Sequence, residues 1–227
     1  MIGLKKAEKG AAFALALILS GCSSAGSNNS NYWNLFQLLK QSWAASTGHV
    51  RVSYEQVAAV PYASLGYRLD GGNQMMLVLA TDTDGDLLWT SPSRVVLVTR
   101  NGRIVRSLGL GHDLAALTTS DRSASPAPIA ALKAPFTSSR LEDFPDIGLY
   151  GVLITCQARQ VGRKGIMILG KRIATMRVDE ACRSANLDWS FVDSFWLDAD
   201  SGLVWQSRQH IHPKGGVIEL ETLRPPG

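Results

Sequence analysis

The first group of residues that could do chemistry consists of three closely spaced aspartates. Asp82, Asp84 and Asp86 present a carboxylate at every second position, and calcium takes such oxygen ligands. An EF-hand loop needs its glycine after the third acid and a glutamate at the twelfth position. Here Gly85 precedes the third acid and Ser93 occupies position twelve. The pattern therefore favours a solvated turn between two strands over a calcium site.

Two histidines form the second candidate. His210 and His212 are two residues apart, so on a β-strand they would share one face and could both reach a metal ion. Metal sites usually need three or four convergent ligands, and no third ligand is evident nearby before Pro213. We therefore expect two surface histidines near a strand end, with no metal and no other cofactor.

No catalytic set can be identified. The acidic pairs Glu142–Asp143 and Asp179–Glu180 are adjacent in sequence, so on a strand the two carboxylates of each pair would point to opposite faces. Such pairs do not make a glycosidase dyad. The sequence also has no Gly-x-Ser-x-Gly elbow and no glycine-rich phosphate loop. These absences favour a function without catalysis.

The clearest chemical signal is a site of lipid attachment. Three lysines precede an apolar run over residues 11–19, and the run ends in Leu19-Ser20-Gly21 followed by Cys22. A positive flank, a short apolar segment and a small-residue cleavage site make a secretory signal. We predict that residues 1–21 are removed and that Cys22 becomes the first residue, acylated on its sulfur. Ser23, where an aspartate would indicate retention at the inner membrane, favours anchoring in the outer membrane at its periplasmic face.

Composition limits the range of partners. The whole chain has 227 residues and a net charge of +4, but the signal segment holds three lysines and one glutamate, so its removal leaves a charge of +2. No dense Lys/Arg run is interleaved with aromatic residues, so nucleic acid is not an expected partner. No other apolar run approaches the roughly 20 residues of a transmembrane helix.

Two cysteines remain beside the acylated one. Because the predicted compartment is oxidising, Cys156 and Cys182 are candidates for a disulfide. The alternative is two separate buried thiols.

The beginning of the mature chain divides into two parts. Residues 22–31 are small and polar and should form a flexible tether. The next segment, residues 32–43, predicts a short amphipathic helix, which either packs on the following domain or lies on the membrane or a partner. Its large apolar residues recur at helical spacing: Tyr32, Leu35, Phe36, Leu39 and Trp43.

The rest of the chain predicts one mainly β domain over residues 32–227. A capping box at Ser53 and Gln56 precedes a short helix over 54–59. Asn101-Gly102 is a strong signal for a two-residue hairpin turn, and a Pro-, Ser- and Ala-rich connection covers about 118–135. Short strands joined by such turns indicate an antiparallel sandwich or a barrel-like sheet. The strand candidates are 63–69, 74–81, 87–90, 94–99, 103–108, 147–161, 165–169, 173–180, 189–197, 203–211 and 217–223.

Tryptophans near the end of the chain could stack on sugar rings. Trp189 and Trp196 are separated by an odd number of residues, so on one regular strand they would face opposite ways. At least one should therefore be a core residue, and the other could contribute to a carbohydrate platform with Trp205.

The lipobox and several later motifs resemble the YjbF/GfcB family, the group 4 capsule polysaccharide lipoproteins of Gram-negative bacteria. The resemblance covers about residues 53–223 and is poor over about 118–149. The motifs that carry it are Val60-Pro61-Tyr62-Ala63-Ser64, Leu97-Val98-Thr99-Arg100-Asn101-Gly102-Arg103-Ile104-Val105, Phe195-Trp196-Leu197-Asp198 through Gly202, and Trp205-Gln206-Ser207.

This resemblance implies a mainly β fold and a role in making or exporting capsular or other exopolysaccharide. It also implies partners, namely an outer-membrane barrel-like protein and a polysaccharide export channel of the same system, with polysaccharide itself as a further candidate. It supplies no catalytic residues. A polysaccharide-modifying enzyme and a lipid or lipoprotein carrier remain alternatives. The candidate surface contacts are Arg100, Asn101, Gly102, Arg103, Trp196 and Trp205.

Overall fold

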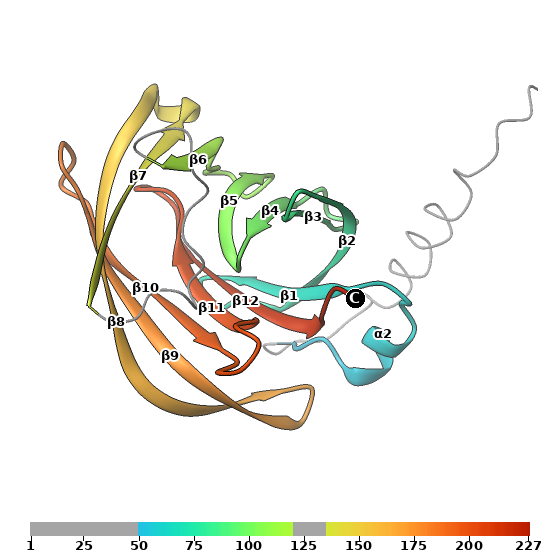
Figure 1. The fold of residues 1–227 in the computed structure, drawn as a ribbon. Coiled ribbons are helices and arrows are strands. Elements are labelled where there is room, and N and C mark those ends of the chain that lie inside the picture. The colour runs from blue at the N-terminus through green and yellow to red at the C-terminus, as the bar shows by residue number, and fades with distance from the viewer. Residues whose placement is uncertain (1–49, 120–134) are drawn as a thin grey trace, which may run out of the picture.

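The computed structural model describes residues 50–119 and 135–227 (Figure 1). The predicted signal peptide, tether and amphipathic helix, and most of the predicted 118–135 connection, lie outside these residues. In the described part, helix α2 (Tyr54–Ala58) precedes twelve strands, and the single turn of 3-10 helix η2 (Pro145–Ile147) lies between β7 and β8. None of its helices is long and apolar enough to cross a bilayer.

The strands are β1 (Ser64–Leu69), β2 (Met75–Thr83), β3 (Asp86–Thr90), β4 (Val96–Arg100), β5 (Arg103–Leu108), β6 (Ala116–Thr119), β7 (Phe136–Phe144), β8 (Leu149–Ile168), β9 (Lys171–Ser184), β10 (Ser190–Leu197), β11 (Val204–His210) and β12 (Val217–Arg224).

All twelve strands belong to one antiparallel sheet that curls into a nearly closed barrel. Its order is β5-β4-β3-β2-β1-β12-β11-β10-β9-β8-β7-β6, so the first and last strands pair and the sheet ends at β5 and β6. These two end strands lie side by side in Figure 1. The predicted mainly β, barrel-like sheet is confirmed.

Turn chemistry explains why the strands follow one another as hairpins. Asn101 and Gly102 have φ angles of 52° and 80°, and Asp84 and Gly85 have φ angles of 53° and 82°. Two consecutive positive φ angles are those of the tight turn whose twist suits a hairpin. The predicted turns between β4 and β5 and between β2 and β3 are confirmed.

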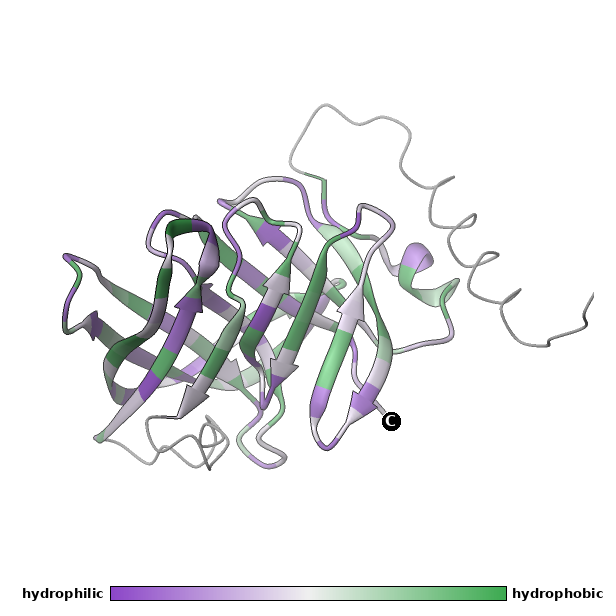
Figure 2. Cartoon of the chain, turned by 90° about the horizontal axis from the view of Figure 1, so that it is seen from above, coloured by the Kyte–Doolittle hydropathy of each residue, from purple (hydrophilic) through white to green (hydrophobic). Residues whose placement is uncertain are grey.

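Successive side chains of each strand point to opposite faces of the sheet, so the barrel has an inner and an outer face. Figure 2 shows hydrophobic and hydrophilic residues following one another along several strands. The larger apolar cluster includes Tyr67, Trp89 and Phe144. A second cluster, with Val57 of α2 packed among residues such as Trp196, covers the other side of the sheet. Because Ser53 and Gln56 cap α2 reciprocally as predicted, the helix begins where it can cover this face.

Three parts of the strand prediction were wrong, among them the short strand β6, which was not predicted. The predicted strands 147–161 and 165–169 are one strand, β8, in which the register shifts next to Gly162. Gly162 has a φ of 135°, which permits this bulge, and the bulge interrupts the sequence pattern without ending the strand. Strand β7 was missed because Arg140 and Glu142, both buried, occupy positions where the pattern would show apolar residues.

The side chain of Gln209 makes hydrogen bonds with backbone groups at the free edge of β5. The side-chain carbonyl of Gln209 on β11 accepts a hydrogen bond from the backbone N–H of Ile104 (2.9 Å), and its amide nitrogen donates to the backbone carbonyl of Gly102 (2.9 Å). The Gln209 amide thus takes the place that a neighbouring strand would have in a fully closed ladder. It ties β5 to the opposite wall of the barrel, because β11 and β5 are far apart in the sheet order.

Candidate functional site

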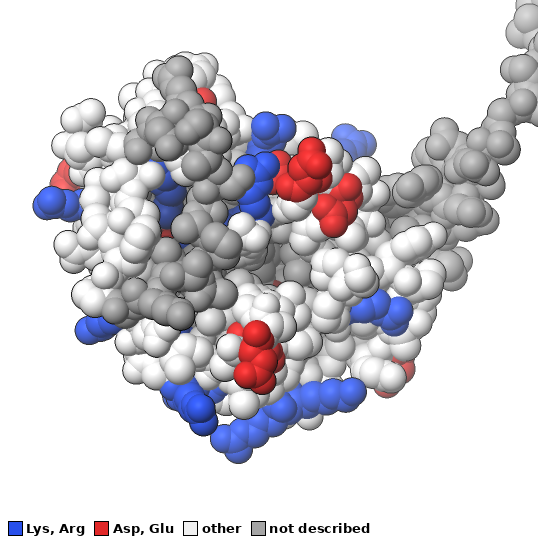
Figure 3. All heavy atoms as spheres, viewed as in Figure 1, with Lys and Arg blue, Asp and Glu red and all other residues white. Residues whose placement is uncertain are grey.

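One end of the barrel opens into a hollow of about 410 Å³. Figure 3 shows the molecule hollowed near the middle of this face, with acidic side chains on two sides. The turns β2–β3 and β10–β11 border the hollow through Asp82 and Ser201. Its lining residues include Leu65, Leu87, Trp89, Thr99, Val204, Trp205, Ser207, Leu220 and Thr222.

The hollow combines aromatic surface with hydroxyl groups. The indole N–H of Trp89 donates to Thr99 Oγ1 (2.8 Å), which fixes the ring against the wall of the barrel. Trp205 on β11 is partly buried; it borders the hollow and also packs against the second apolar cluster. Flat rings stack on apolar faces of a ligand, while a few hydroxyls and carboxylates at the margin can hydrogen-bond its polar groups. The arrangement therefore suits a ligand with both apolar faces and hydroxyl groups.

The residues of the β4–β5 hairpin tip, which were predicted to form a surface contact, are only partly at the surface. Arg100 is partly exposed and paired with Asp86 (2.5 Å), and Asn101 is exposed at the hollow. A Cβ at Gly102 would lie 2.4 Å from a methyl carbon of Val204, so glycine allows the tip to approach β11. Arg103, by contrast, is buried, and its surface role is not supported.

The two tryptophans predicted as surface contacts, Trp196 and Trp205, differ in their surroundings. Trp196 lies in the second apolar cluster beneath the guanidinium of Arg177, 5.2 Å from the ring centre, and is almost wholly buried. Trp205 lines the hollow. Trp189 is half-buried and packs edge-on against Phe144 in the larger cluster. Of the three, only Trp205 borders the hollow, and it also packs against the second apolar cluster that contains Trp196.

Behind the hollow, the barrel contains a buried charge cluster that the sequence did not reveal. Arg103 donates to Glu180 (2.7 Å), and Arg140 donates to Glu142 (2.6 Å). Arg140 also lies 3.6 Å from Glu180 and 3.4 Å from Asp193. These five side chains, from β5, β7, β9 and β10, are all nearly inaccessible to water. We call them the buried charge cluster.

Burial raises the pKa of the two glutamates in this cluster, whereas pairing with arginine lowers it. Burial alone would raise the pKa of Glu180, but Arg103 and Arg140 outweigh it and the pKa is lowered. For Glu142, burial prevails over Arg140 and the pKa is raised.

The two candidate cysteines are joined beneath this cluster. Cys156 and Cys182 stand directly opposite each other on β8 and β9, and the structure contains a disulfide between them. Both residues are buried in the larger apolar cluster, and Arg140 Nη1 lies 3.3 Å from Cys156 Sγ. The bridge fastens two long neighbouring strands at the wall that carries Glu180.

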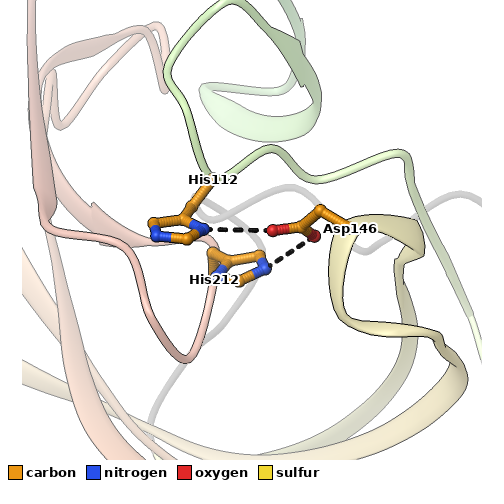
Figure 4. Close-up of side chains that lie close together, drawn as sticks. All are labelled: His112, Asp146 and His212. Carbon is orange, nitrogen blue, oxygen red and sulfur yellow. Dashed lines mark hydrogen bonds and ion pairs between the residues drawn. The ribbon is translucent and has the colours of Figure 1, made fainter.

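Three turns meet at a second polar cluster, shown in Figure 4. Asp146 of η2 accepts hydrogen bonds through its two carboxylate oxygens, from His112 Nδ1 (3.0 Å) and His212 Nε2 (3.0 Å). The two imidazole rings are stacked, with centres 4.9 Å apart. His112 follows β5, and His212 follows β11, so Asp146 links three separate connections of the barrel. We call these residues the His–Asp–His bridge.

Two histidines and a carboxylate are also common ligands of zinc, and the possible ligand atoms of the bridge all lie within 4.8 Å of one another. The backbone N–H of Lys214 donates to His212 Nδ1 (3.0 Å), which therefore carries a lone pair rather than a proton. A neutral ring then carries its proton on Nε2, the atom that faces Asp146. Because a metal would need a lone pair there, the arrangement fits a hydrogen-bonded bridge and does not fit a metal ion.

The bridge predicts a pH dependence of stability. Burial lowers the pKa of His212, although the Asp146 carboxylate acts the other way. As the pH falls, His212 therefore becomes protonated in the unfolded chain at a higher pH than in the folded protein. The contribution of neutral His212 to stability is complete above the unfolded pKa of about 6.5 and is lost as pH falls from there toward the lower folded pKa.

We expect the wild-type free energy of unfolding to fall more steeply between pH 7.5 and 5 than that of His212→Gln. The glutamine keeps a donor for Asp146 but cannot gain a proton. The difference in slope should reach at most about 1.4 kcal/mol per pH unit, the value for one proton. Urea unfolding at several pH values measures it, and identical slopes would contradict the assignment.

The prediction of two surface histidines was wrong for His212, which is buried. Strand β11 ends at His210, so His212 lies in the following turn and the two rings do not share a strand face. His210 instead contacts Asp193 through Nδ1 (3.1 Å), and its own backbone N–H donates to the same carboxylate (2.8 Å). The partners of His212 are distant in sequence, which is why a search for nearby ligands could not find them.

Comparisons with known proteins agree with this fold. Residues 33–223 match the YjbF family, described as group 4 capsule polysaccharide lipoprotein GfcB, YjbF. The uncharacterized lipoprotein GfcB of Escherichia coli K12 is 23% identical over 176 residues, which cover 78% of this chain and 82% of that protein. The uncharacterized lipoprotein YjbF of the same strain is 32% identical over 108 residues, covering 47% of this chain and 46% of that protein.

The crystal structure of the hypothetical lipoprotein YmcC from Escherichia coli K12 has the same fold. It superposes with a TM-score of 0.71 at 22% identity, covering 89% of this chain and 100% of that one. Since the family match extends over most of the chain, including every described strand except the last residue of β12, the chain belongs to the YjbF/GfcB family of group 4 capsule polysaccharide lipoproteins.

Proposed function

We propose that this protein is a lipid-anchored accessory factor in the assembly or export of capsular or other exopolysaccharide, and that it acts by binding rather than by catalysis. The observation that carries the proposal is the family match over residues 33–223. The lipobox ending at Cys22 supports an anchor in the outer membrane, facing the periplasm. A barrel-like partner protein and an export channel of the same membrane are the proposed protein partners.

The hollow supports a direct contact with the polymer. Trp205 borders it, and the exposed residues Asp82, Asn101 and Ser201 at its edge carry polar groups that can hydrogen-bond a sugar. The acidic turns at its edge can accept hydrogen bonds from sugar hydroxyls. We therefore place a short stretch of polysaccharide in the hollow.

The polar clusters support binding over catalysis. The buried charge cluster is nearly inaccessible to water and its charged groups pair with one another, so a substrate does not reach it. The His–Asp–His bridge contains no serine or cysteine that could act as a nucleophile, and its carboxylate is engaged by both rings. The roles that these clusters support are structural.

Complementation of a deletion strain tests the proposal. Loss of the gene should sharply reduce the polysaccharide at the cell surface, and the wild-type chain should restore it. Cys22→Ala should fail to restore it even when the protein accumulates to the wild-type level, because the domain is no longer held at the membrane. A deletion strain with unchanged surface polysaccharide would rule the proposal out.

A further inference from the structure

A groove of about 650 Å³ lies on the opposite side of the β12 wall from the hollow. Leu220 and Thr222 line the hollow, whereas Glu221 and Leu223 line the groove, as alternation along a strand requires. The start of α2 and the end of the β8–β9 hairpin form its other walls. The apolar part of the lining is Val52, Ile166, Met167, Leu169 and Leu223, and the polar part includes Arg51, Glu55, Gln74, Gln206 and Glu221.

The groove leaves large apolar side chains in contact with water. Met167 near the end of β8 is 57% exposed, and Tyr54 at the start of α2 is 59% exposed. Both line the groove. An exposed apolar surface with a polar margin commonly marks a place where another segment binds, and 650 Å³ is within the range of pockets that enclose ligand-sized groups.

The described part of the chain begins at the edge of this groove. The Val50 carbonyl accepts from the Gln74 backbone N–H (2.8 Å), and the Val50 N–H donates to the Asn73 side chain (3.1 Å). The Val52 N–H donates to the Gln74 side chain (3.0 Å). These bonds fix the point from which the preceding residues depart, so the segment before Val50 starts beside the exposed apolar surface.

The sequence supplies a segment of the right chemistry close by. Residues 32–43, outside the described residues, contain Tyr32, Leu35, Phe36, Leu39 and Trp43 at helical spacing, with Lys40 as the sole charged residue. Residues 44–50 connect this segment to the groove and can reach about 24 Å when extended. That reach is enough for the segment to turn back onto the groove.

We propose that the groove is the docking site of residues 32–43 of the same chain, whose apolar face would cover Met167 and the apolar wall. An amphipathic helix lying in an apolar groove is a common mode of recognition. Lys40 would lie near the carboxylates of Glu55 and Glu221 at the margin. Because only nine residues lie between the predicted lipid anchor at Cys22 and Tyr32, docking would also hold the barrel close to the membrane with this side toward it.

Cysteine pairs in the full-length chain test the contact. Leu39→Cys combined with Met167→Cys should form an intramolecular disulfide in an oxidising compartment, detected by peptide mass spectrometry. Lys40→Cys with Met167→Cys is the matched control, because residue 40 lies on the polar face of the predicted helix. Equal cross-linking of the two pairs, no cross-linking, or cross-links only between two chains would each overturn the proposal.

Trypsin gives a second readout, because Lys40 is the single lysine or arginine between Lys9 and Arg51. Met167→Asp should speed cleavage after Lys40 at least about tenfold, whereas Met167→Leu should leave it unchanged. Met167 is mostly exposed, so neither substitution should unfold the barrel. The same cleavage rate in wild type and Met167→Asp, on membranes carrying the lipidated protein, would show that the segment does not occupy the groove.

Discussion

Replacing Glu180 by alanine is expected to lower the free energy of unfolding by about 3–5 kcal/mol. Glu180 has no exposed side-chain surface and holds Arg103 at 2.7 Å and Arg140 at 3.6 Å. Without it, Arg103 keeps its positive charge inside the barrel but loses its ion-pair partner, and the ring of Phe195 lies 5.2 Å away. Chemical denaturation of the purified protein measures the loss.

Asp179→Ala is the matched control for this prediction. Asp179 is the neighbouring residue on β9, points away from Glu180 and pairs with Arg177 near the surface. A partly exposed pair contributes about 0–1 kcal/mol, so this variant should stay close to wild type. The double variant Arg103→Leu with Glu180→Leu should be less destabilised than Glu180→Ala, because it removes both charges. Equal losses for Glu180→Ala and Asp179→Ala would contradict the role of the buried charge cluster.

Removing the disulfide should have the second-largest effect. Cys156 and Cys182 are separated by 26 positions in the sequence, and closing a loop of that size lowers the entropy of the unfolded chain. The double variant Cys156→Ala with Cys182→Ala should therefore lose about 3.5 kcal/mol of unfolding free energy.

Reduction of the wild-type protein supplies the control, since dithiothreitol should lower its stability to nearly that of the double variant and should not affect the double variant. Labelling of thiols in the unreduced, unfolded wild-type protein should find neither cysteine free. Two reactive thiols, or a double variant as stable as wild type, would contradict the bridge.

Local turn chemistry made the hairpins of this fold predictable. Asn101-Gly102 and Asp84-Gly85 specify their turns through the backbone angles that these residues tolerate, and Ser53 with Gln56 specifies the start of α2. Closure of the barrel was only one of two predicted architectures. It depends on β1 pairing with β12, a contact between the two ends of the domain that no local pattern encodes.

The polar clusters were not predictable for a related physical reason. Arg140 and Glu142 break the alternation that identifies a strand, and the further partners of Arg140 come from strands far along the chain. Asp146 likewise meets His112 and His212 only because three connections converge at one place. The partners of His212 are equally distant in sequence, so its burial was not predicted and it was expected at the surface.

The measurement that tests the account most directly is the amount of polysaccharide on the surface of the deletion strain when it carries Trp205→Ala. Trp196→Ala is the matched control, because it removes the same side chain from the adjacent strand but not from the lining of the hollow. With both proteins folded, lipidated and equally abundant, the account predicts low surface polysaccharide with Trp205→Ala and near wild-type levels with Trp196→Ala. Full restoration by Trp205→Ala would contradict a role for the hollow in holding the polymer.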